Sequence, residues 1–443
     1  MTTHKIGLFG LTVLIISTVM GSGIILLPSV LAGIGEISLL SWVVSTLGAL
    51  ALAFSFAKCA KYCKKHGGMS AYAQSAHGRS AFFLASYAFY VCNILAAVAI
   101  AVTCTSYFAY FIPWLGIKGH AVFGVIFLLV LAVVINFISP KFVTRVVSIT
   151  VWGIISCVCI VAIIGWFWFK PHIFVQGWNP QHKSLFSGVA SGISYTLWAF
   201  LGIGVAGAVS GNVKNPEKNL PRALIISIVF VAIAYILATA VIAGIIPNDI
   251  LRHSRTPFGA VYSYMFTPFI GSLINLISFI SATGSLFALH FANSMVAKVA
   301  SDNQLFPKIL GKTSKRGAAY SSLILLLVVE LALALAIVSP DLLRDFRVLV
   351  NAATFLNLIP YILTVTALAS LMARRKVKGN ERMFGLIISI FATVYSIFAI
   401  YSTGQASVFY GCLILMFGYL FFGYIAARDI KNDYLNKIEV EEY

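Results

Sequence analysis

Two glycine clusters interrupt apolar stretches of this sequence, and they are the residues whose types and spacing could bind a ligand. The first is Met20-Gly21-Ser22-Gly23-Ile24, and the second runs from Trp198 to Gly204. A helix broken in lipid leaves N–H and C=O groups that are costly to bury unless something satisfies them. Carbonyls at the end of one half-helix suit an ammonium, and N–H groups at the start of the next suit a carboxylate. The pattern therefore predicts a site for an α-amino acid.

The alternative interpretation is that these glycines only allow close helix packing, as small residues often do in membranes. Packing would be the better explanation of a single cluster. Here the two clusters occupy corresponding positions, because each opens a set of five apolar stretches. A matched pair of interrupted helices is a sequence indication of a transporter binding site. The odd number of five helices per set predicts that the two sets have opposite orientations in the membrane.

The elements that must position these clusters are membrane-spanning helices. Of the 443 residues, 60% are hydrophobic and only 10% are charged, against about 25% charged in soluble domains. Spanning the hydrocarbon takes ~20 apolar residues, and the sequence supplies twelve such stretches. The predicted spans are 6–33, 37–59, 80–112, 121–139, 143–169, 186–210, 222–246, 266–299, 318–339, 345–372, 383–402 and 406–427. The first is too long for a signal peptide, and a polar tail follows the last.

The formal net charge of +18 raises the question of a nucleic-acid partner. The 31 Lys and Arg residues instead alternate between the two sides of the predicted spans, and all but seven lie on the side of both termini. The seven are Lys118, Lys170, Lys183, Arg252, Arg255, Arg344 and Arg347. By the positive-inside rule both termini are predicted to be cytoplasmic, in a bacterial inner membrane. Binding to nucleic acid would need a basic patch interleaved with stacking aromatics, and none is recognisable in this sequence.

The seven cysteines lie mostly inside predicted spans, so they are interpreted as packing residues. Cys59 and Cys63 are one helical turn apart, but no further pair completes a four-ligand metal site. No metal and no cofactor are expected. The predicted partners are a small amino acid or amine and the bilayer, and a homodimer is left open.

Several motifs in order along the chain resemble the amino acid/polyamine/organocation transporters, especially the branch of basic amino acid and polyamine antiporters that includes arginine/agmatine exchangers. The motifs are Gly21-Ser22-Gly23-Ile24 with Leu26-Leu27-Pro28, Thr196-Leu197-Trp198, Asn212-Val213-Lys214-Asn215-Pro216 and Asp302-Asn303-Gln304-Leu305-Phe306-Pro307. The resemblance implies an all-α, leucine-transporter-type fold of twelve helices. Its 5+5 inverted repeat would comprise residues 1–180 and 181–375, with two more helices and a cytoplasmic tail in 376–443.

The resemblance also implies roles for individual residues. The substrate carboxylate would meet Ser22 and Gly23, and the α-ammonium would meet the carbonyls of Val19, Trp198 and Leu201. Trp198 would cap the bound substrate, although a Trp there could also be a core or interface residue. Phe89 and Tyr361 match further aromatic gate positions.

Three positions depart from the pattern of basic-substrate antiporters. Gly204 stands where those proteins carry a glutamate, Leu289 where they carry a stacking tryptophan, and Ala353 where a serine contacts substrate. A buried cationic side chain would then need oxygens or aromatic faces from elsewhere. Asn93 and Thr18 are candidate donors of side-chain oxygens.

Two ionisable residues lie deep in predicted spans, His290 and Glu330. Such residues are functional candidates by default in a membrane. His290 is predicted to sense protonation or contact substrate; the alternative is a ring satisfied by hydrogen bonds between helices. Pairing within the scaffold is the corresponding alternative for Glu330.

The function predicted from these observations is secondary active transport, with no enzymatic activity. The leading hypothesis is an antiporter that exchanges a basic amino acid, such as arginine, for a related amino acid or its amine product by alternating access. A transporter of neutral amino acids is the alternative, coupled to protons or working by exchange. A channel is remote because no repeated filter is recognisable, and a nucleophile–base set typical of a hydrolase is not recognisable either.

Overall fold

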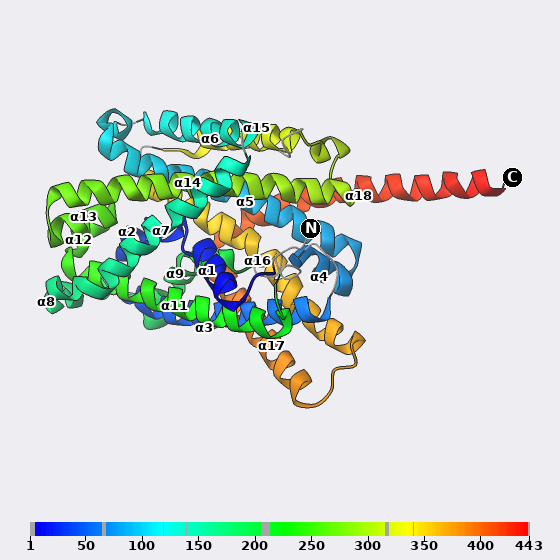
Figure 1. Cartoon of the computed structure of the whole chain (residues 1–443), viewed down its shortest axis with the longest axis horizontal. Helices are drawn as coiled ribbons and strands as arrows, with labels where there is room; N and C mark the ends of the chain where they lie inside the picture. The colour runs from blue at the N-terminus through cyan, green and yellow to red at the C-terminus, as the bar shows by residue number, and fades with distance from the viewer. Residues whose placement is uncertain are drawn as a thin grey trace.

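The computed structural model describes residues 5–63, 68–117, 119–138, 140–204, 213–314, 319–339 and 341–441, and within them the regular structure is helical (Figure 1). Ten of these helices are long and apolar enough to cross a membrane. They are α3 (Ser38–Tyr62), α5 (Arg79–Phe111), α6 (Ala121–Ile138), α7 (Pro140–Ile164), α11 (Pro216–Ile245), α14 (Pro268–Asp302), α15 (Tyr320–Ile337), α16 (Leu342–Arg374), α17 (Gly379–Ser402) and α18 (Gln405–Glu441). The protein is therefore a polytopic membrane protein.

The two predicted spans that are missing from these ten are the two that contain the glycine clusters. The first is divided into α1 (Leu8–Val19), the 3₁₀ turn η1 (Ser22–Ile24) and α2 (Leu27–Ala32). The second consists of α9 (Leu185–Trp198) and the 3₁₀ turn η4 (Leu201–Gly204), and residues 205–212 lie outside the described part of the chain. Both clusters thus end a helix, as predicted. Pro28 restarts the first span, since proline fits the first turn of a helix.

Short helices and turns close the ends of the bundle. They are α4 (Gly68–His77), α8 (Pro171–Gln176), α12 (Asn248–Leu251), α13 (Pro257–Met265), and the 3₁₀ turns η2 (Pro113–Gly116), η3 (Gly165–Trp168) and η6 (Lys308–Gly311). Figure 1 shows α8, α12 and α13 gathered at one end of the molecule, and α4 and the end of α18 at the other. We call these the α8 end and the α4 end.

The long helices differ in how deeply they lie in the bundle. In α5, 89% of the most apolar window is buried, whereas in α18 only 17% is. α5 packs mainly against α16 and α14, so these three form the centre. The outward faces of α17 and α18 carry exposed Ile, Phe and Leu side chains, which suits contact with lipid.

The last helix is longer than the sequence analysis predicted. The predicted span ends at 427 with a polar tail after it, but α18 continues to Glu441. The segment between 428 and 441 contains the helix formers Lys, Glu and Leu and has no Gly or Pro, so the helix can continue beyond the apolar segment. Figure 1 shows this extension projecting alone from the α4 end.

Candidate functional site

The two interrupted spans meet backbone to backbone. A Cβ atom at Gly202 would lie only 2.7 Å from the carbonyl oxygen of Thr18 and 3.1 Å from the Cα of Val19. Those atoms belong to the end of α1 and its backbone, so they cannot rotate away as a side chain would. Only glycine allows the end of α1 and the turn after α9 to approach this closely. The two glycine clusters therefore meet at one place in the structure.

Three tyrosines satisfy carbonyl groups freed by the breaks. The Tyr235 hydroxyl donates to the carbonyl oxygen of Val19 at 3.3 Å, and Tyr361 donates to that of Leu201 at 2.8 Å. Tyr107 donates to Ile25 at 3.2 Å. In lipid no water is present to donate to these carbonyls, so donors from neighbouring helices must satisfy them. Because a carbonyl oxygen has two lone pairs, the Val19 and Leu201 carbonyls can still accept a second hydrogen bond.

A cavity of about 950 Å³ adjoins the two breaks. Of the predicted substrate and gate residues, it is lined by Val19, Gly23, Phe89, Asn93, Trp198 and Leu201. Gly204 and Leu289, two of the three departures from the basic-substrate pattern, line it as well. Residues from distant parts of the sequence are therefore brought together around one cavity.

Ala353, Tyr361 and His290 lie away from the cavity lining. Ala353 is fully buried in α16, and Tyr361 is fully buried where it holds the Leu201 carbonyl. The backbone of Ser22 is in η1, but its side chain is outside the described part of the structure. His290 is buried in α14 and faces α15 rather than the cavity.

The polar groups of the cavity are neutral. Among the described residues that line it there is no Asp, Glu, Lys, Arg or His. Asn93 and Asn357 contribute amides, and Ser86 and Ser285 contribute hydroxyls. Trp198 presents an indole N–H about 3.4 Å from where a Cβ of Gly23 would lie, and this donor has no partner in the described part of the protein. A ligand can thus be held by carbonyls, amides, one indole N–H and aromatic faces.

The cavity extends toward one end of the bundle. Its lining includes Met69 and Ser70 of α4 and Ala300 near the end of α14. On the other side of the breaks Trp42, Phe200 and Tyr235 form a fully buried aromatic cluster, with Trp42 5.9 Å from Phe200 and 5.2 Å from Tyr235 between ring centroids. The cavity therefore opens toward the α4 end and is closed toward the α8 end.

A sequence profile described as amino acid permease matches residues 6–427 of this chain, which covers nine of the ten long helices, α18 as far as residue 427, and both breaks. The chain belongs to the amino acid permease family. This confirms the resemblance to the amino acid/polyamine/organocation transporters, and the family consists of transporters rather than enzymes.

Individual relatives of this permease align over nearly their whole length. It is 39% identical to the putrescine transporter PotE of Escherichia coli K12 over 437 residues, 97% of this chain and 98% of the relative. The PotE protein of Haemophilus influenzae is 36% identical over 97% of this chain and 99% of its own length. The cadaverine/lysine antiporter of E. coli K12 is 29% identical over 94% and 95%. The relatives therefore fall within the predicted branch of basic amino acid and polyamine antiporters.

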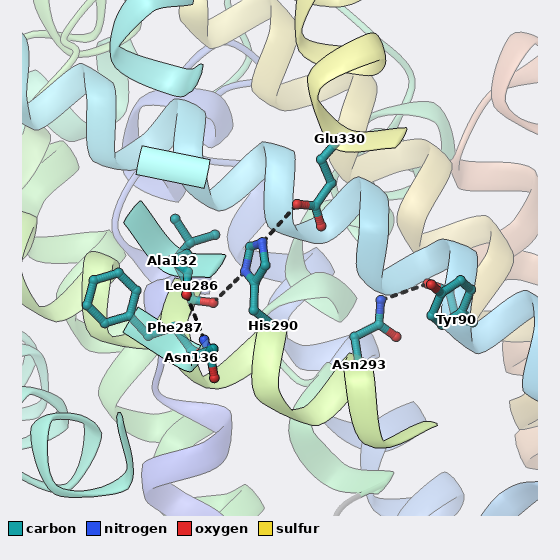
Figure 2. Close-up of polar contacts among 8 residues, drawn as sticks. All are labelled: Tyr90, Ala132, Asn136, Leu286, Phe287, His290, Asn293 and Glu330. Carbon is teal, nitrogen blue, oxygen red and sulfur yellow. Dashed lines mark hydrogen bonds and ion pairs between the residues drawn. The ribbon is translucent and has the colours of Figure 1, made fainter. Parts of the chain in front are cut away.

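The permease also contains a buried polar cluster behind the cavity wall (Figure 2). His290 Nε2 lies 2.8 Å from Glu330 Oε2, and both side chains are fully buried. His290 Nδ1 lies 2.9 Å from the carbonyl oxygen of Leu286. Since that carbonyl can only accept, Nδ1 carries a proton and Nε2 faces the carboxyl. The contact joins α14 to α15, and neighbouring residues of α14, such as Leu289 and Phe291, line the cavity.

A second polar chain does reach the cavity. Asn93, which lines it, donates from Nδ2 to Asn293 Oδ1 at 3.3 Å. Asn293 in turn donates to the Tyr90 carbonyl at 3.2 Å, a contact drawn in Figure 2. The sequence analysis found Asn93 but missed Asn293, Asn357 and Tyr235. An asparagine within a predicted membrane helix is a usable signal for the first two. A tyrosine in such a helix is too common to single out Tyr235.

Proposed function

We propose that this permease is an antiporter that exchanges a basic amino acid, such as arginine or lysine, for a related amino acid or its amine product by alternating access. The observation that carries the proposal is the contact of two broken helices beside a cavity of about 950 Å³. The relatives, a putrescine transporter and a cadaverine/lysine antiporter, support this choice of substrates.

The amino acid head group would bind at the breaks. Its ammonium would donate hydrogen bonds to the carbonyls of Val19, Trp198 and Leu201, of which the first and third are already oriented by tyrosines. Its carboxylate would meet the backbone at Ser22 and Gly23, beside the indole N–H of Trp198. The carbonyl groups at the end of one half-helix are complementary to the ammonium, and the N–H groups at the start of the next are complementary to the carboxylate.

A cationic side chain would extend into the rest of the cavity. Aromatic faces such as those of Phe89 and Trp198 can attract a cation, and Asn93 and Asn357 offer amide oxygens. This arrangement compensates a charge without a carboxylate. Phe89 and Trp198 would close over the substrate as gates.

A second candidate, transport of neutral amino acids, is favoured by a specific observation. The described lining contains no carboxylate, and Gly204 and Leu289 make the cavity less polar than the basic-substrate pattern implies. Leaving a guanidinium without an anionic partner in a low-dielectric site is costly. The two candidates differ only in what the distal part of the cavity holds.

We further propose the architecture and orientation in which this cycle would work. The ten long helices and the two interrupted spans make twelve, arranged as inverted repeats 1–180 and 181–375 followed by two helices. Both termini would face the cytoplasm of a bacterial cell with the protein in its inner membrane, so the α4 end would be cytoplasmic. The open cavity then represents an inward-facing state.

The buried pair of His290 and Glu330 is proposed to hold a proton that the transport cycle senses. With Nδ1 donating to Leu286, the pair shares one further proton between Nε2 and the carboxyl. Replacing His290 by Gln keeps a polar side chain and removes the titrating ring. We expect the pH dependence of uptake to change, and an unchanged pH profile with normal folding would leave His290 only a structural role.

Counterflow in proteoliposomes tests the proposed exchange. Vesicles preloaded with unlabelled lysine or arginine should accumulate external labelled lysine, arginine or cadaverine, whereas empty vesicles should not. Accumulation without preloading would indicate coupled uptake, whereas equilibration of the label without accumulation would indicate a channel. Counterflow with leucine and not with arginine or lysine would establish the second candidate and overturn the first.

A further inference from the structure

A second, smaller cavity lies at the α8 end of the bundle, on the far side of the breaks from the central cavity. Its volume is about 290 Å³. It is lined by the end of α2, the segment before α9, the outer turns of α9 and α16, and the turn between α17 and α18. We call it the outer vestibule. Its polar lining residues are Gln181, Lys183, Ser191, Tyr195, Arg347, Asn351, Ser402 and Thr403.

The outer vestibule contains two cations and, among its described lining residues, no carboxylate. Lys183 Nζ lies 3.0 Å from the hydroxyl of Ser191, a neutral partner. Arg347 is half-buried, and its guanidinium would lie 3.8 Å from a Cβ at Gly33. Two positive side chains facing one small cavity produce a local field that attracts anions.

The acidic residues on neighbouring segments are engaged elsewhere. Asp345 accepts hydrogen bonds from the backbone and hydroxyl of Ser339, at 2.6 and 2.8 Å. Asp341 caps the first turn of α16 by accepting from the backbone N–H of Arg344. Glu36 is buried against Asn248 rather than lining the vestibule. The positive charge of the vestibule is therefore not neutralised from these positions.

Polar residues connect the vestibule to the level of the breaks. The Ser194 hydroxyl donates to Asn351 Oδ1 at 2.8 Å, and Asn351 Nδ2 donates to the Tyr195 hydroxyl at 3.2 Å. Trp198, one helical turn further along α9, lines the central cavity. On α16 the distance along the axis from Arg347 to Asn357 is about 15 Å. The vestibule thus lies where the closed side of the proposed site would open.

We propose that the outer vestibule is a carboxylate-binding subsite that captures amino acids from the outside and discriminates against their decarboxylated amines. This inference rests on the proposed function, because it requires an amino acid as the external substrate. A guanidinium presents paired donors that match a carboxylate, and Lys183 adds a second charge. A diamine has only positive ends, which Arg347 and Lys183 repel.

Lysine and cadaverine are suitable probes, because they differ only in the carboxylate. In right-side-out vesicles preloaded with unlabelled substrate, Arg347→Gln should raise the external KM for lysine about tenfold and leave that for cadaverine unchanged or lower. Lys183→Gln should act in the same direction. Arg344→Gln is the matched control, since Arg344 is exposed on the same turn of α16 and does not line the vestibule. Equal changes for both probes, or none, would overturn the subsite.

A second measurement does not depend on transport. Gln181 is exposed and lines the vestibule, so a Gln181→Cys variant can be modified there from outside. Lysine should slow this modification, cadaverine should not, and Arg347→Gln should abolish the protection by lysine. Labelling that lysine never slows would refute the subsite. Protection by lysine in a protein that fails to exchange lysine would instead preserve the subsite and refute the proposed antiport.

Discussion

At the scale of single residues, the site depends on hydroxyl groups that hold backbone carbonyls in place. Tyr235 and Tyr361 each donate to a carbonyl at one break, and those are the carbonyls proposed to bind an ammonium. Tyr361 was predicted from sequence as a gate. Its position, fully buried and in contact with Leu201, indicates that it positions the backbone of the site instead.

Replacing Tyr361 by Phe tests this role. The variant keeps the ring and its packing against Phe56 but leaves the Leu201 carbonyl without its donor. We expect unfolding to become easier by about 1–2 kcal/mol, because a buried acceptor loses its partner. Thermal unfolding in detergent measures this, with the exposed Tyr401→Phe as control. A Tyr361→Phe protein as stable as the control would show that the hydroxyl contributes nothing.

Glu36 predicts a pH dependence of stability. It lies between α2 and α3, and burial raises the pKa of its carboxyl from 4.5 to about 8. Because the unfolded chain ionises first as pH rises, stability is fully present below about pH 4.5 and is lost as pH rises to about 8. Melting temperatures measured across this window should fall less steeply in Glu36→Gln. Parallel curves for the two proteins would contradict the prediction.

At the scale of elements, the decisive feature is how closely the ends of two helices approach. The end of α1 and the turn η4 touch through their backbones at Gly202. In a membrane such irregular backbone is tolerated only where it is buried in protein or lines a cavity. The contact between the two breaks satisfies that condition and also places both sets of carbonyls beside one cavity.

Gly202→Ala should therefore separate the two breaks. The new methyl group would meet the Thr18 carbonyl at 2.7 Å, and backbone must move to accommodate it. We expect counterflow to fall by at least about tenfold, since small displacements of a binding site are costly. Gly423→Ala in α18 is the control, because a Cβ there would meet nothing within 4 Å. Normal exchange by Gly202→Ala would contradict the proposed contact.

At the scale of the whole molecule, the two cavities fit one state of the proposed transport cycle. The central cavity opens toward the α4 end, and the aromatic cluster of Trp42, Phe200 and Tyr235 is fully buried on the other side of the breaks. Alternating access would require this cluster to part while the α4 end closes.

Cysteine labelling tests both this state and the proposed orientation. A cysteine at Ser86, which lines the central cavity, should react with a membrane-impermeant reagent in inside-out vesicles and not in right-side-out vesicles. A cysteine at Gln181 should show the opposite pattern. The native Cys92 and Cys412 are replaced by serine in both variants, since the first lines the cavity and the second is exposed. Reversed accessibility would refute the assignment of the α4 end to the cytoplasm.

The sequence by itself determined the helical spans and the two interruptions, because both are local properties. A stretch of ~20 apolar residues is expected to span the bilayer as a helix, and a matched pair of glycine clusters indicates two interrupted helices. The family resemblance then implied that Val19, Trp198 and Leu201 share one site, and Asn93 was a candidate because of its polar side chain; all four line the cavity.

Only the tertiary structure decided which way the side chains of each helix face. A helix in a soluble protein shows its buried side as an apolar stripe, but a membrane helix is apolar toward both lipid and core. The sequence alone therefore could not predict that His290 contacts Glu330, that Ala353 and Tyr361 lie outside the cavity lining, or that Tyr235 donates to the Val19 carbonyl. Those outcomes depend on packing between helices distant in sequence, where a rotation of one helix changes every contact it makes.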